Sequence, residues 1–308
     1  MRAVVFGYHE IGHVCLEGLI AFGTEILCLF THKDDPEEQI WFNKPGMLAE
    51  RYNIPVYTPE NLKEATWVNL IKDMSPDIIF SFYYRKMIPK EILDIPKIGA
   101  FNLHGSLLPR FRGRSPVNWV LIEGEKKTGL TLHYMLEKPD AGDIIAQREV
   151  MIEFDDNAYT VFMKMVREAR VLMKEILPQL KEGTFKRIPQ ADLGPSTYFG
   201  GRRPEDGLIS WQKDALSIYN LTRAVTHPYP GAFTYLDGKR FYIWKAYPED
   251  GGRGVSPGAV ISKKPLKVNT GNGVLKLLRV QLEGEDEMDG ETFATIHNIK
   301  DKMLGGQS

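Results

Sequence analysis

The chain has 308 residues, of which 43% are hydrophobic and 26% charged, and its formal net charge is −1. These values are ordinary for a globular protein of roughly two domains, and they exclude a broad electrostatic attraction to nucleic acid or to an anionic membrane. No apolar run approaches the roughly 20 residues that a membrane-spanning helix needs. The chain opens directly on a predicted strand, and Cys15 and Cys28 form no metal-binding or C-x-x-C pattern, so we expect a cytoplasmic protein.

The first half of the sequence alternates short apolar segments with helical patterns, which predicts a Rossmann-like, mostly parallel sheet flanked by helices. The predicted strands are 3–6, 25–30, 55–57, 77–82 and 100–103, and the helical patterns lie at 10–22, 46–53, 60–74 and 88–94. Two further strands are expected at 129–135 and 143–150. The amphipathic helix predicted over 158–177 has an apolar stripe that we assign to core packing.

The second half predicts a smaller domain. Glycine and proline mark a linker at 189–203, so we divide the chain into a catalytic domain, 1–188, and a C-terminal domain, 204–308. A helix is expected at 214–226, followed by short strands at 231–236, 240–245, 257–262, 265–270 and 273–280. This spacing favours a small β-barrel. We interpret the acidic run from Glu283 to Glu291 as a solvated loop.

The segment Asn102-Leu103-His104-Gly105-Ser106-Leu107-Leu108-Pro109 is the most informative motif, because it begins inside a predicted buried strand. Asn102 and His104 are two residues apart and therefore project to the same face of that strand. An amide donor can stabilise an oxyanion and an imidazole can move protons, while Asp140, in a later turn, can raise the imidazole's pKa. This trio predicts an acyl-transfer site, although an isolated His104 is more simply explained as a buried residue at the end of a strand.

Other chemistry-bearing residues are more simply explained without catalysis. The segment from Gly7 to Gly12 lacks the G-x-G-x-x-G spacing of a dinucleotide site, and Ser106 lacks a G-x-S-x-G context. The remaining histidines show no metal-ligand spacing, so we expect them to be structural or exposed, and no metal is predicted. They are His9, His13, His32, His133, His227 and His297.

Several motifs together resemble those of formyltetrahydrofolate-dependent formyltransferases. They are Asn102-x-His104-x-Ser106-Leu107-Leu108-Pro109-x-x-Arg112-Gly113, Asp140-Ala141-Gly142, Phe80-Ser81-Phe82-Tyr83-Tyr84-Arg85, Arg112-Gly113-Arg114-Ser115-Pro116-x-Asn118-Trp119-Val120, Phe199-Gly200-Gly201-Arg202-Arg203-Pro204-Glu205-Asp206 and His227-Pro228-x-Pro230-Gly231-Ala232-Phe233. Nearly the whole chain is covered. The motifs look most like the formyltransferase domain of bifunctional polymyxin-resistance enzymes, which formylates UDP-4-amino-4-deoxy-L-arabinose for lipid A modification. The second, dehydrogenase-decarboxylase domain of those enzymes is not in this sequence.

The resemblance implies an OB-like C-terminal domain, 10-formyltetrahydrofolate as co-substrate, and Asn102, His104 and Asp140 as catalytic residues. It places the folate pocket at Lys86, Met87, Ile88, Arg114, Leu136, Glu137, Lys138, Pro139 and Asp140. Met87, Ile88 and Leu136 are suitable apolar walls. Lys86 stands where the similar enzymes have histidine, which puts a side-chain contact there in doubt.

The acceptor contacts are harder to predict. Candidates for a nucleotide diphosphate and its sugar are Arg112, Asn118, Trp119, Arg202, Arg203, Asp206 and Trp211. Each has a structural alternative, because the tryptophans can be core anchors and the arginines can be solvated.

A primary amine attacking the formyl carbon would create an oxyanion to which Asn102 and a protonated His104 could donate. Methionyl-tRNA formyltransferases share this core but must hold a polyanion. Residues 204–308 contain 13 lysines and arginines against 13 aspartates and glutamates. The loop 31–46 contains two lysines against four acidic residues, so neither segment has the excess of positive charge that binding to RNA favours. We therefore favour a nucleotide-linked amino sugar. Other UDP, dTDP or GDP sugars, and a non-enzymatic folate-binding module, remain alternatives.

Overall fold

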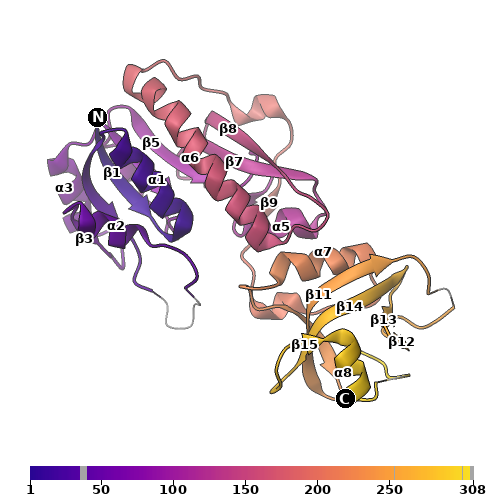
Figure 1. Ribbon diagram of the computed structural model, residues 1–308. Helices are drawn as coiled ribbons and strands as arrows, with labels where there is room; N and C mark the ends of the chain where they lie inside the picture. The colour runs from indigo at the N-terminus through magenta and orange to yellow at the C-terminus, as the bar shows by residue number, and fades with distance from the viewer. Residues whose placement is uncertain (35–39, 253, 300, 306–308) are drawn as a thin grey trace. The chain divides into compact units, whose positions relative to one another are not determined.

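The computed structural model describes residues 1–34, 40–252, 254–299 and 301–305, and these form two compact units (Figure 1). The first unit comprises 1–116, 127–151 and 162–200, and the second comprises 117–126, 152–161 and 201–308. Two short internal segments thus group with the C-terminal half. The functional division at 189–203 stays a prediction.

The first unit is built on a seven-stranded sheet with the order β3-β2-β1-β4-β5-β7-β8. The pairs from β3 to β5 are parallel, whereas β7 and β8 are added as antiparallel strands. The strands are β1 (Arg2–Gly7), β2 (Glu25–Phe30), β3 (Val56–Tyr57), β4 (Ile78–Phe82), β5 (Gly99–His104), β7 (Lys127–Tyr134) and β8 (Ile144–Met151). The predicted mostly parallel sheet is confirmed.

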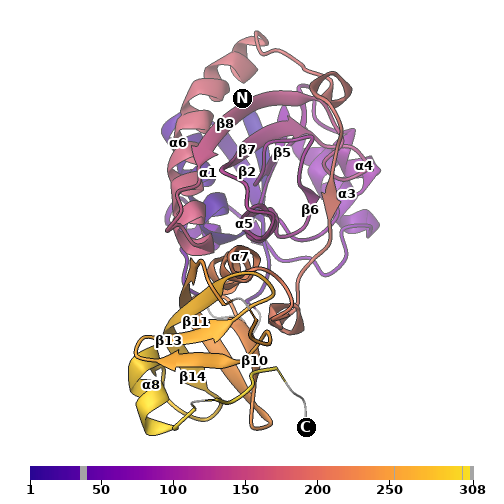
Figure 2. The ribbon, with the colours of Figure 1, turned by 90° about the vertical axis from the view of Figure 1, so that its right-hand side faces the viewer.

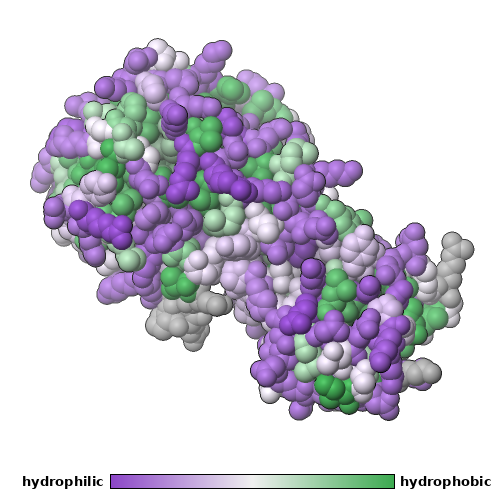
Figure 3. All heavy atoms as spheres, in the orientation of Figure 1, coloured by the Kyte–Doolittle hydropathy of each residue, from purple (hydrophilic) through white to green (hydrophobic). Residues whose placement is uncertain are grey.

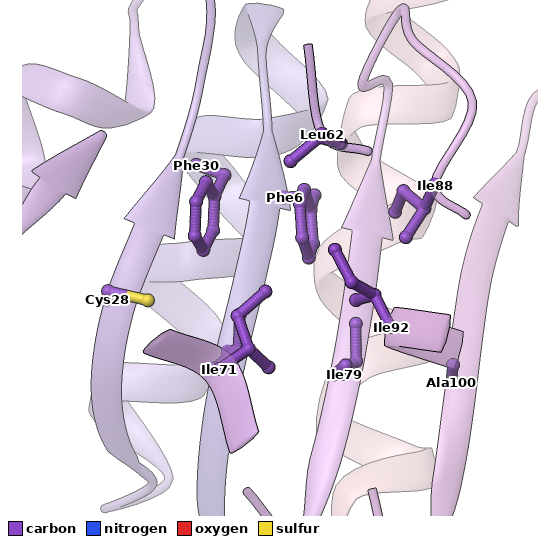
Figure 4. Packing of buried hydrophobic residues seen from close by; sticks show 10 residues of the cluster. Phe6, Cys28, Phe30, Leu62, Ile71, Ile79, Ile88, Ile92 and Ala100 are labelled. Atoms are coloured by element: carbon purple, nitrogen blue, oxygen red, sulfur yellow. The ribbon is translucent and has the colours of Figure 1, made fainter. Parts of the chain in front are cut away.

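Helices cover both faces of this sheet. The helices are α1 (His9–Ala21), α2 (Pro45–Arg51), α3 (Ala65–Met74), α4 (Lys90–Leu93) and α6 (Ala158–Glu182). Helices α1 and α6 lie on one face and α3 and α4 on the other (Figure 2). Side chains from alternate positions of the central strands, such as Phe6 and Ile79, pack against Ile71 of α3 and Ile92 of α4 (Figure 4). Consecutive residues of β1 and β4 are buried, because helices cover both faces of the sheet.

The second unit contains an antiparallel sheet with the order β10-β11-β14-β13-β12, and β15 pairs with β14. Its elements are η2 (Pro204–Gly207), α7 (Ala215–Val225), β10 (Ala232–Leu236), β11 (Lys239–Glu249), β12 (Val260–Lys263), β13 (Leu266–Asn269), β14 (Val274–Leu282), β15 (Met288–Asp289) and α8 (Gly290–Ile296). The predicted smaller, strand-rich domain is confirmed. An OB-like barrel stays a prediction, because the strand pairing found within the described residues runs along an open path.

Three local features depart from the sequence prediction. Helix α5 (Pro116–Ile122) was not predicted, although proline is favoured at a first helical position. The acidic run is not wholly a loop, because Asp289 accepts hydrogen bonds from the backbone N–H groups of Glu291 and Thr292 and thereby caps α8. The predicted linker contains a 3₁₀ turn, η1 (Gln190–Leu193), and strand β9 (Tyr198–Phe199), which pairs with β6 (Arg112–Gly113).

The surface agrees with the ordinary composition. On the face drawn in Figure 3, hydrophilic residues predominate and hydrophobic ones are interspersed among them. Among the described residues, no helix is both long enough and apolar enough to cross a bilayer.

Candidate active site

The end of β5 carries two polar side chains between apolar ones. Phe101 and Leu103 are buried in the core, whereas Asn102 and His104 point to the other face of the strand. His104 is itself 6% exposed. Strand β7 lies antiparallel to β5 and places His133 directly opposite Asn102. The strand therefore delivers the amide and the imidazole to one face, as its periodicity predicts.

Asp140 reaches His104 from the turn between β7 and β8. Its Oδ1 lies 3.4 Å from His104 Nδ1, and its Oδ2 accepts a 2.9 Å hydrogen bond from the backbone N–H of Gly113. The turn is tight: Asp140 has a φ of 53°, and a Cβ on Gly142 would lie 2.0 Å from the carbonyl oxygen of Tyr134. Only glycine fits at 142, because the backbone of this turn passes so close to Tyr134.

The two titratable groups affect one another in opposite directions. Burial alone would raise the pKa of Asp140, but the nearby imidazoles of His104 and His133 and the Gly113 N–H lower it to about 2. For His104, burial lowers the pKa and outweighs the Asp140 carboxylate, which raises it. Asp140 therefore acts on the imidazole in the predicted direction, by raising its pKa, while burial of the ring acts in the opposite direction and is the larger effect.

The hydrogen bond at the other ring nitrogen defines the tautomer of His104. Nε2 lies 2.8 Å from the backbone carbonyl oxygen of Phe111. A carbonyl oxygen only accepts, so Nε2 carries the proton, and in the neutral ring Nδ1 is free to take one. Ser106 donates to the carbonyl oxygens of Arg110 and Phe111, so its hydroxyl caps backbone groups of this loop.

The loop that supplies these backbone groups is held by the segment predicted as a linker. Thr197 accepts from the backbone N–H of Phe111 at 2.8 Å. The β6–β9 pairing is so close that a Cβ on Gly113 would lie 2.1 Å from the carbonyl oxygen of Phe199. The buried Gln190 accepts from Arg112 and donates to the carbonyl oxygens of Asp140 and Gly142.

His133 and Gln190 are the polar residues that sequence reasoning missed. His133 is 1% exposed, and its Nε2 lies 3.2 Å from Asn102 Nδ2 and 3.5 Å from Asp140 Oδ1. His133 was set aside for lack of metal-ligand spacing, and Gln190 lay in a predicted linker. The available signal for His133 was its position within the strand predicted at 129–135.

The predicted folate residues occupy two loops of the first unit. Met87 and Leu136 are 60% and 53% exposed, as apolar walls awaiting a ligand would be, whereas Ile88 is 7% exposed and belongs to the core cluster (Figure 4). Met135, which precedes Leu136, packs against the core cluster that contains Ile88, so both loops border this cluster, and Glu137 is exposed.

The polar members of the folate set differ in what they already contact. Lys86 donates to the carbonyl oxygens of Pro59 and Glu60, at 2.8 and 2.9 Å, so its ammonium group ties two loops together. Lys138 and Pro139 are exposed, and so is the side chain of Arg114, whose backbone N–H donates to Phe199.

Most acceptor candidates belong to the second unit, whereas Arg112 belongs to the first. Trp119 lies under the guanidinium of Arg202, with 4.8 Å to the ring centroid. Arg202 also donates to the carbonyl oxygen of Asp206, whose carboxylate accepts from the backbone N–H of Arg203.

Two of the acceptor candidates use their polar groups internally. Asn118 donates to the carbonyl oxygen of Ala224, and Trp211 donates to Thr234. These contacts are structural, and a role in binding the acceptor stays a prediction. Within the described ranges, no group of three His, Cys, Asp or Glu side chains is arranged to hold a metal ion.

Solved structures share this fold at low sequence identity. WlaRD, a sugar 3N-formyl transferase solved in the presence of dTDP and 5-N-formyl-THF, matches with a TM-score of 0.67 and 18% identity over 93% of this chain and 99% of its own. An N-formyltransferase from Helicobacter canadensis, in complex with folinic acid and dTDP-3-aminofucose, matches with a TM-score of 0.66 and 18% identity over 90% of this chain and 99% of its own. HypX from Aquifex aeolicus matches with a TM-score of 0.64 and 18% identity over 98% of this chain, which spans 48% of the HypX chain.

Family comparison covers both halves of the sequence. Residues 1–177 match the formyl transferase family, and residues 202–298 match the formyl transferase C-terminal domain. The first match alone spans more than half of the chain and includes Asn102, His104 and Asp140. The chain is therefore a formyltransferase and belongs to the formyl transferase family.

Proposed function

We propose that this enzyme transfers a formyl group from 10-formyltetrahydrofolate to the amine of a nucleotide-linked amino sugar, with UDP-4-amino-4-deoxy-L-arabinose as the best single candidate. The observation that carries the proposal is the environment of His104. Its Nε2 is committed to the Phe111 carbonyl oxygen, and its Nδ1 faces Asp140 at 3.4 Å. Such a ring is neutral at rest and becomes a stabilised cation when Nδ1 takes a proton.

The reaction follows from this arrangement. The neutral amine attacks the formyl carbon, a C–N bond forms, and the carbonyl electron pair moves to oxygen, where an Asn102 N–H donates to the oxyanion. Nδ1 of His104 takes a proton from the amine nitrogen, and the new imidazolium is stabilised by Asp140 and by the Phe111 carbonyl. The oxyanion then collapses, the bond from carbon to folate N10 breaks, and N10 takes the proton from His104. The products are the formamide and tetrahydrofolate.

The folate donor is supported by two independent features. WlaRD and the Helicobacter canadensis enzyme were solved with formylated folates, and they share this fold. In this chain, the exposed Met87 and Leu136 stand on two loops that border the same core cluster. Exposed apolar side chains beside backbone donors suit a flat heterocycle such as pterin.

An amino-sugar nucleotide is supported by the motifs and by charge. The same two solved relatives are named as a sugar formyltransferase and as a complex with dTDP-3-aminofucose. A diphosphate concentrates charge that a couple of arginines can satisfy by bidentate hydrogen bonds, and Arg112, Arg202 and Arg203 remain the candidates. The neutral C-terminal half offers no broad basic face for RNA. In the acidic loop 31–46, Asp35, Glu37 and Glu38 lie outside the described residues, and Asp34 pairs with Lys44.

The competing function is formylation of methionyl-tRNA. A methionyl-tRNA formyltransferase from Clostridium thermocellum shares the fold with a TM-score of 0.59 and 19% identity over 93% of this chain and 100% of its own, so fold alone does not separate the two. Binding of tRNA would weaken steeply with added salt, whereas binding of a small diphosphate would weaken less.

The decisive experiment offers one enzyme preparation, with 10-formyltetrahydrofolate, a panel of acceptors. The panel contains UDP-4-amino-4-deoxy-L-arabinose, dTDP- and GDP-linked amino sugars, and charged methionyl-tRNA. We expect tetrahydrofolate release with the UDP sugar and none with tRNA. Turnover of a dTDP sugar alone would defeat the named substrate but keep the reaction class, and turnover of tRNA alone would overturn the proposal.

The cytoplasmic location remains a prediction.

A further inference from the structure

A second histidine is built into the site. His133 lies on β7 opposite Asn102 and is 1% exposed. Its Nδ1 is 2.8 Å from the carbonyl oxygen of Tyr134, and its Nε2 is 3.2 Å from Asn102 Nδ2. Both ring nitrogens of His133 are therefore engaged, one by the backbone and one by the amide proposed to bind the oxyanion.

These two contacts define the state of the ring. The Tyr134 carbonyl oxygen can only accept, so Nδ1 of His133 carries a hydrogen. The Asn102 amide nitrogen can only donate, so Nε2 of His133 must accept, and the ring is the neutral Nδ1–H tautomer. Asn102 consequently presents its nitrogen, and not its oxygen, to His133.

The consequence for the Asn102 side chain is a fixed orientation. An amide rotated by 180° would turn its oxygen toward the lone pair of Nε2, and the two acceptors would repel each other. With the nitrogen held, one of its two hydrogens bonds His133 and the other is left for a ligand. An oxyanion donor is most effective when it is aligned before the charge develops.

The two histidines also share one carboxylate oxygen. Asp140 Oδ1 lies 3.4 Å from His104 Nδ1 and 3.5 Å from His133 Nε2, so the two rings stand on either side of it. Both rings lower the pKa of Asp140. The group beside them is therefore a carboxylate anion, which can stabilise His104 when that ring becomes charged.

We infer that His133 is a positioning residue for the transfer: it accepts a hydrogen bond from Asn102 and so aligns that amide toward the formyl oxygen. The inference rests on the proposed role of Asn102 as oxyanion donor. Because His133 acts through Asn102, its loss is expected to lower kcat by about 10- to 100-fold, which is less than the 10²- to 10³-fold typical of deleting an oxyanion donor itself.

Two substitutions separate the nitrogens of the ring. His133→Gln can place its side-chain oxygen where Nε2 stands, and so keeps an acceptor for Asn102. His133→Asn can place its amide nitrogen where Nδ1 stands, and so keeps the donor to Tyr134 but removes that acceptor. We expect the Asn variant to lose kcat with KM for both substrates within about twofold, and the Gln variant to recover most of it. Thermal unfolding of each variant reports whether the buried site still folds.

A double-mutant cycle then tests the route through Asn102. Single-turnover formylation of UDP-4-amino-4-deoxy-L-arabinose, or of the best acceptor from the panel above, is measured for His133→Asn, Asn102→Ala and the double variant. We expect His133→Asn to have little further effect once Asn102 is gone, because a positioning residue has nothing left to position.

The outcomes are distinguishable. A folded His133→Asn variant with wild-type kcat, or an equal loss in the presence and absence of Asn102, would overturn the inference but leave the proposed function intact. A folded Asn102→Ala variant with wild-type kcat would overturn the proposed role of Asn102, and the inference with it.

Discussion

Gln190 donates a 2.9 Å hydrogen bond to the backbone carbonyl oxygen of Asp140, although the two residues are fifty positions apart in the sequence. The same amide nitrogen donates to Gly142, and the amide oxygen accepts from Arg112. One buried side chain therefore joins the turn that carries the carboxylate to the loop that carries the Gly113 N–H. Gln190 therefore helps to place Asp140, although none of these hydrogen bonds is made to His104 or Asn102.

Replacing Gln190 by Leu should weaken both stability and catalysis. The substitution leaves buried backbone carbonyls and an arginine without their partner, which typically costs about 1–3 kcal/mol for each unsatisfied group. We expect a clear fall in the midpoint of urea unfolding, together with a lower kcat. Gln190→Glu keeps the acceptor for Arg112 but turns a carboxylate oxygen toward the carbonyl oxygens of Asp140 and Gly142, which repel it, so this variant should also lose activity. Equal activity of wild type and both variants would contradict this role.

The catalytic assignment predicts unequal effects for two neighbouring buried residues. His104→Gln should lower kcat by roughly 10²- to 10⁴-fold, since it removes the group that moves the proton. Ser106→Ala should stay within about tenfold of wild type, because Ser106 only donates to the Arg110 and Phe111 carbonyls. Tetrahydrofolate release is the measurement. An inactive Ser106→Ala variant beside an active His104→Gln variant would reverse the assignment.

Two buried histidines should make the fold sensitive to acid. Burial, with a smaller contribution from Arg85, lowers the pKa of His9 from 6.5 to about 3, and burial lowers that of His104. As the pH falls below 6.5, these two histidines take up protons more readily in the unfolded chain than in the folded chain. Stability is therefore complete above 6.5 and declines below it, by up to about 1.4 kcal/mol per pH unit for each histidine. Asp140, whose pKa is about 2, adds a loss only below about 3.8.

Urea unfolding at pH 8, 7 and 5 checks this expectation. The wild-type free energy of unfolding should change little between pH 8 and 7 on account of these groups, and should fall between pH 7 and 5. His9→Phe keeps an aromatic ring against Phe42, on which His9 stacks, and removes one titrating group. Between pH 7 and 5, the free energy of unfolding of this variant should fall by roughly 2 kcal/mol less than that of the wild type. An unchanged slope would show that His9 is not responsible.

The sequence sufficed for the sheet and for the pair Asn102 and His104 because both depend on local periodicity. The two residues are two apart, and the structure has both in β5, where they point to one face of the strand. His133 and Gln190 were missed because their partners are set by strand register and by a distant segment that returns to the site.

The direction of the His104 pKa shift also lay beyond the sequence. Residue types indicated an attractive Asp140, and the structure does place that carboxylate beside the ring. The depth of burial, which decides the net direction, is a property of the packed site. In the proposed mechanism His104 therefore begins as a base, and it acts as an acid only after it has taken the proton of the amine.

The folate loop offers a prediction based on two adjacent residues of opposite exposure. Met87 is 60% exposed, whereas Ile88 is 7% exposed and packs with Phe6 and Ile92 in the core cluster. If Met87 forms a wall of the pterin site, Met87→Ser should raise KM for 10-formyltetrahydrofolate several-fold and leave the free energy of unfolding nearly unchanged. Ile88→Val should do the reverse: it removes one buried methylene, which typically costs about 0.5–1.5 kcal/mol, and should keep KM.

Initial rates over a range of folate concentrations and urea unfolding of both variants provide the comparison. Leu136→Ser, on the facing loop, should behave like Met87→Ser, because Leu136 is 53% exposed. A normal KM in both serine variants would place the folate elsewhere. A raised KM in Ile88→Val, at unchanged stability, would mean that the core residue rather than its exposed neighbour shapes the pocket.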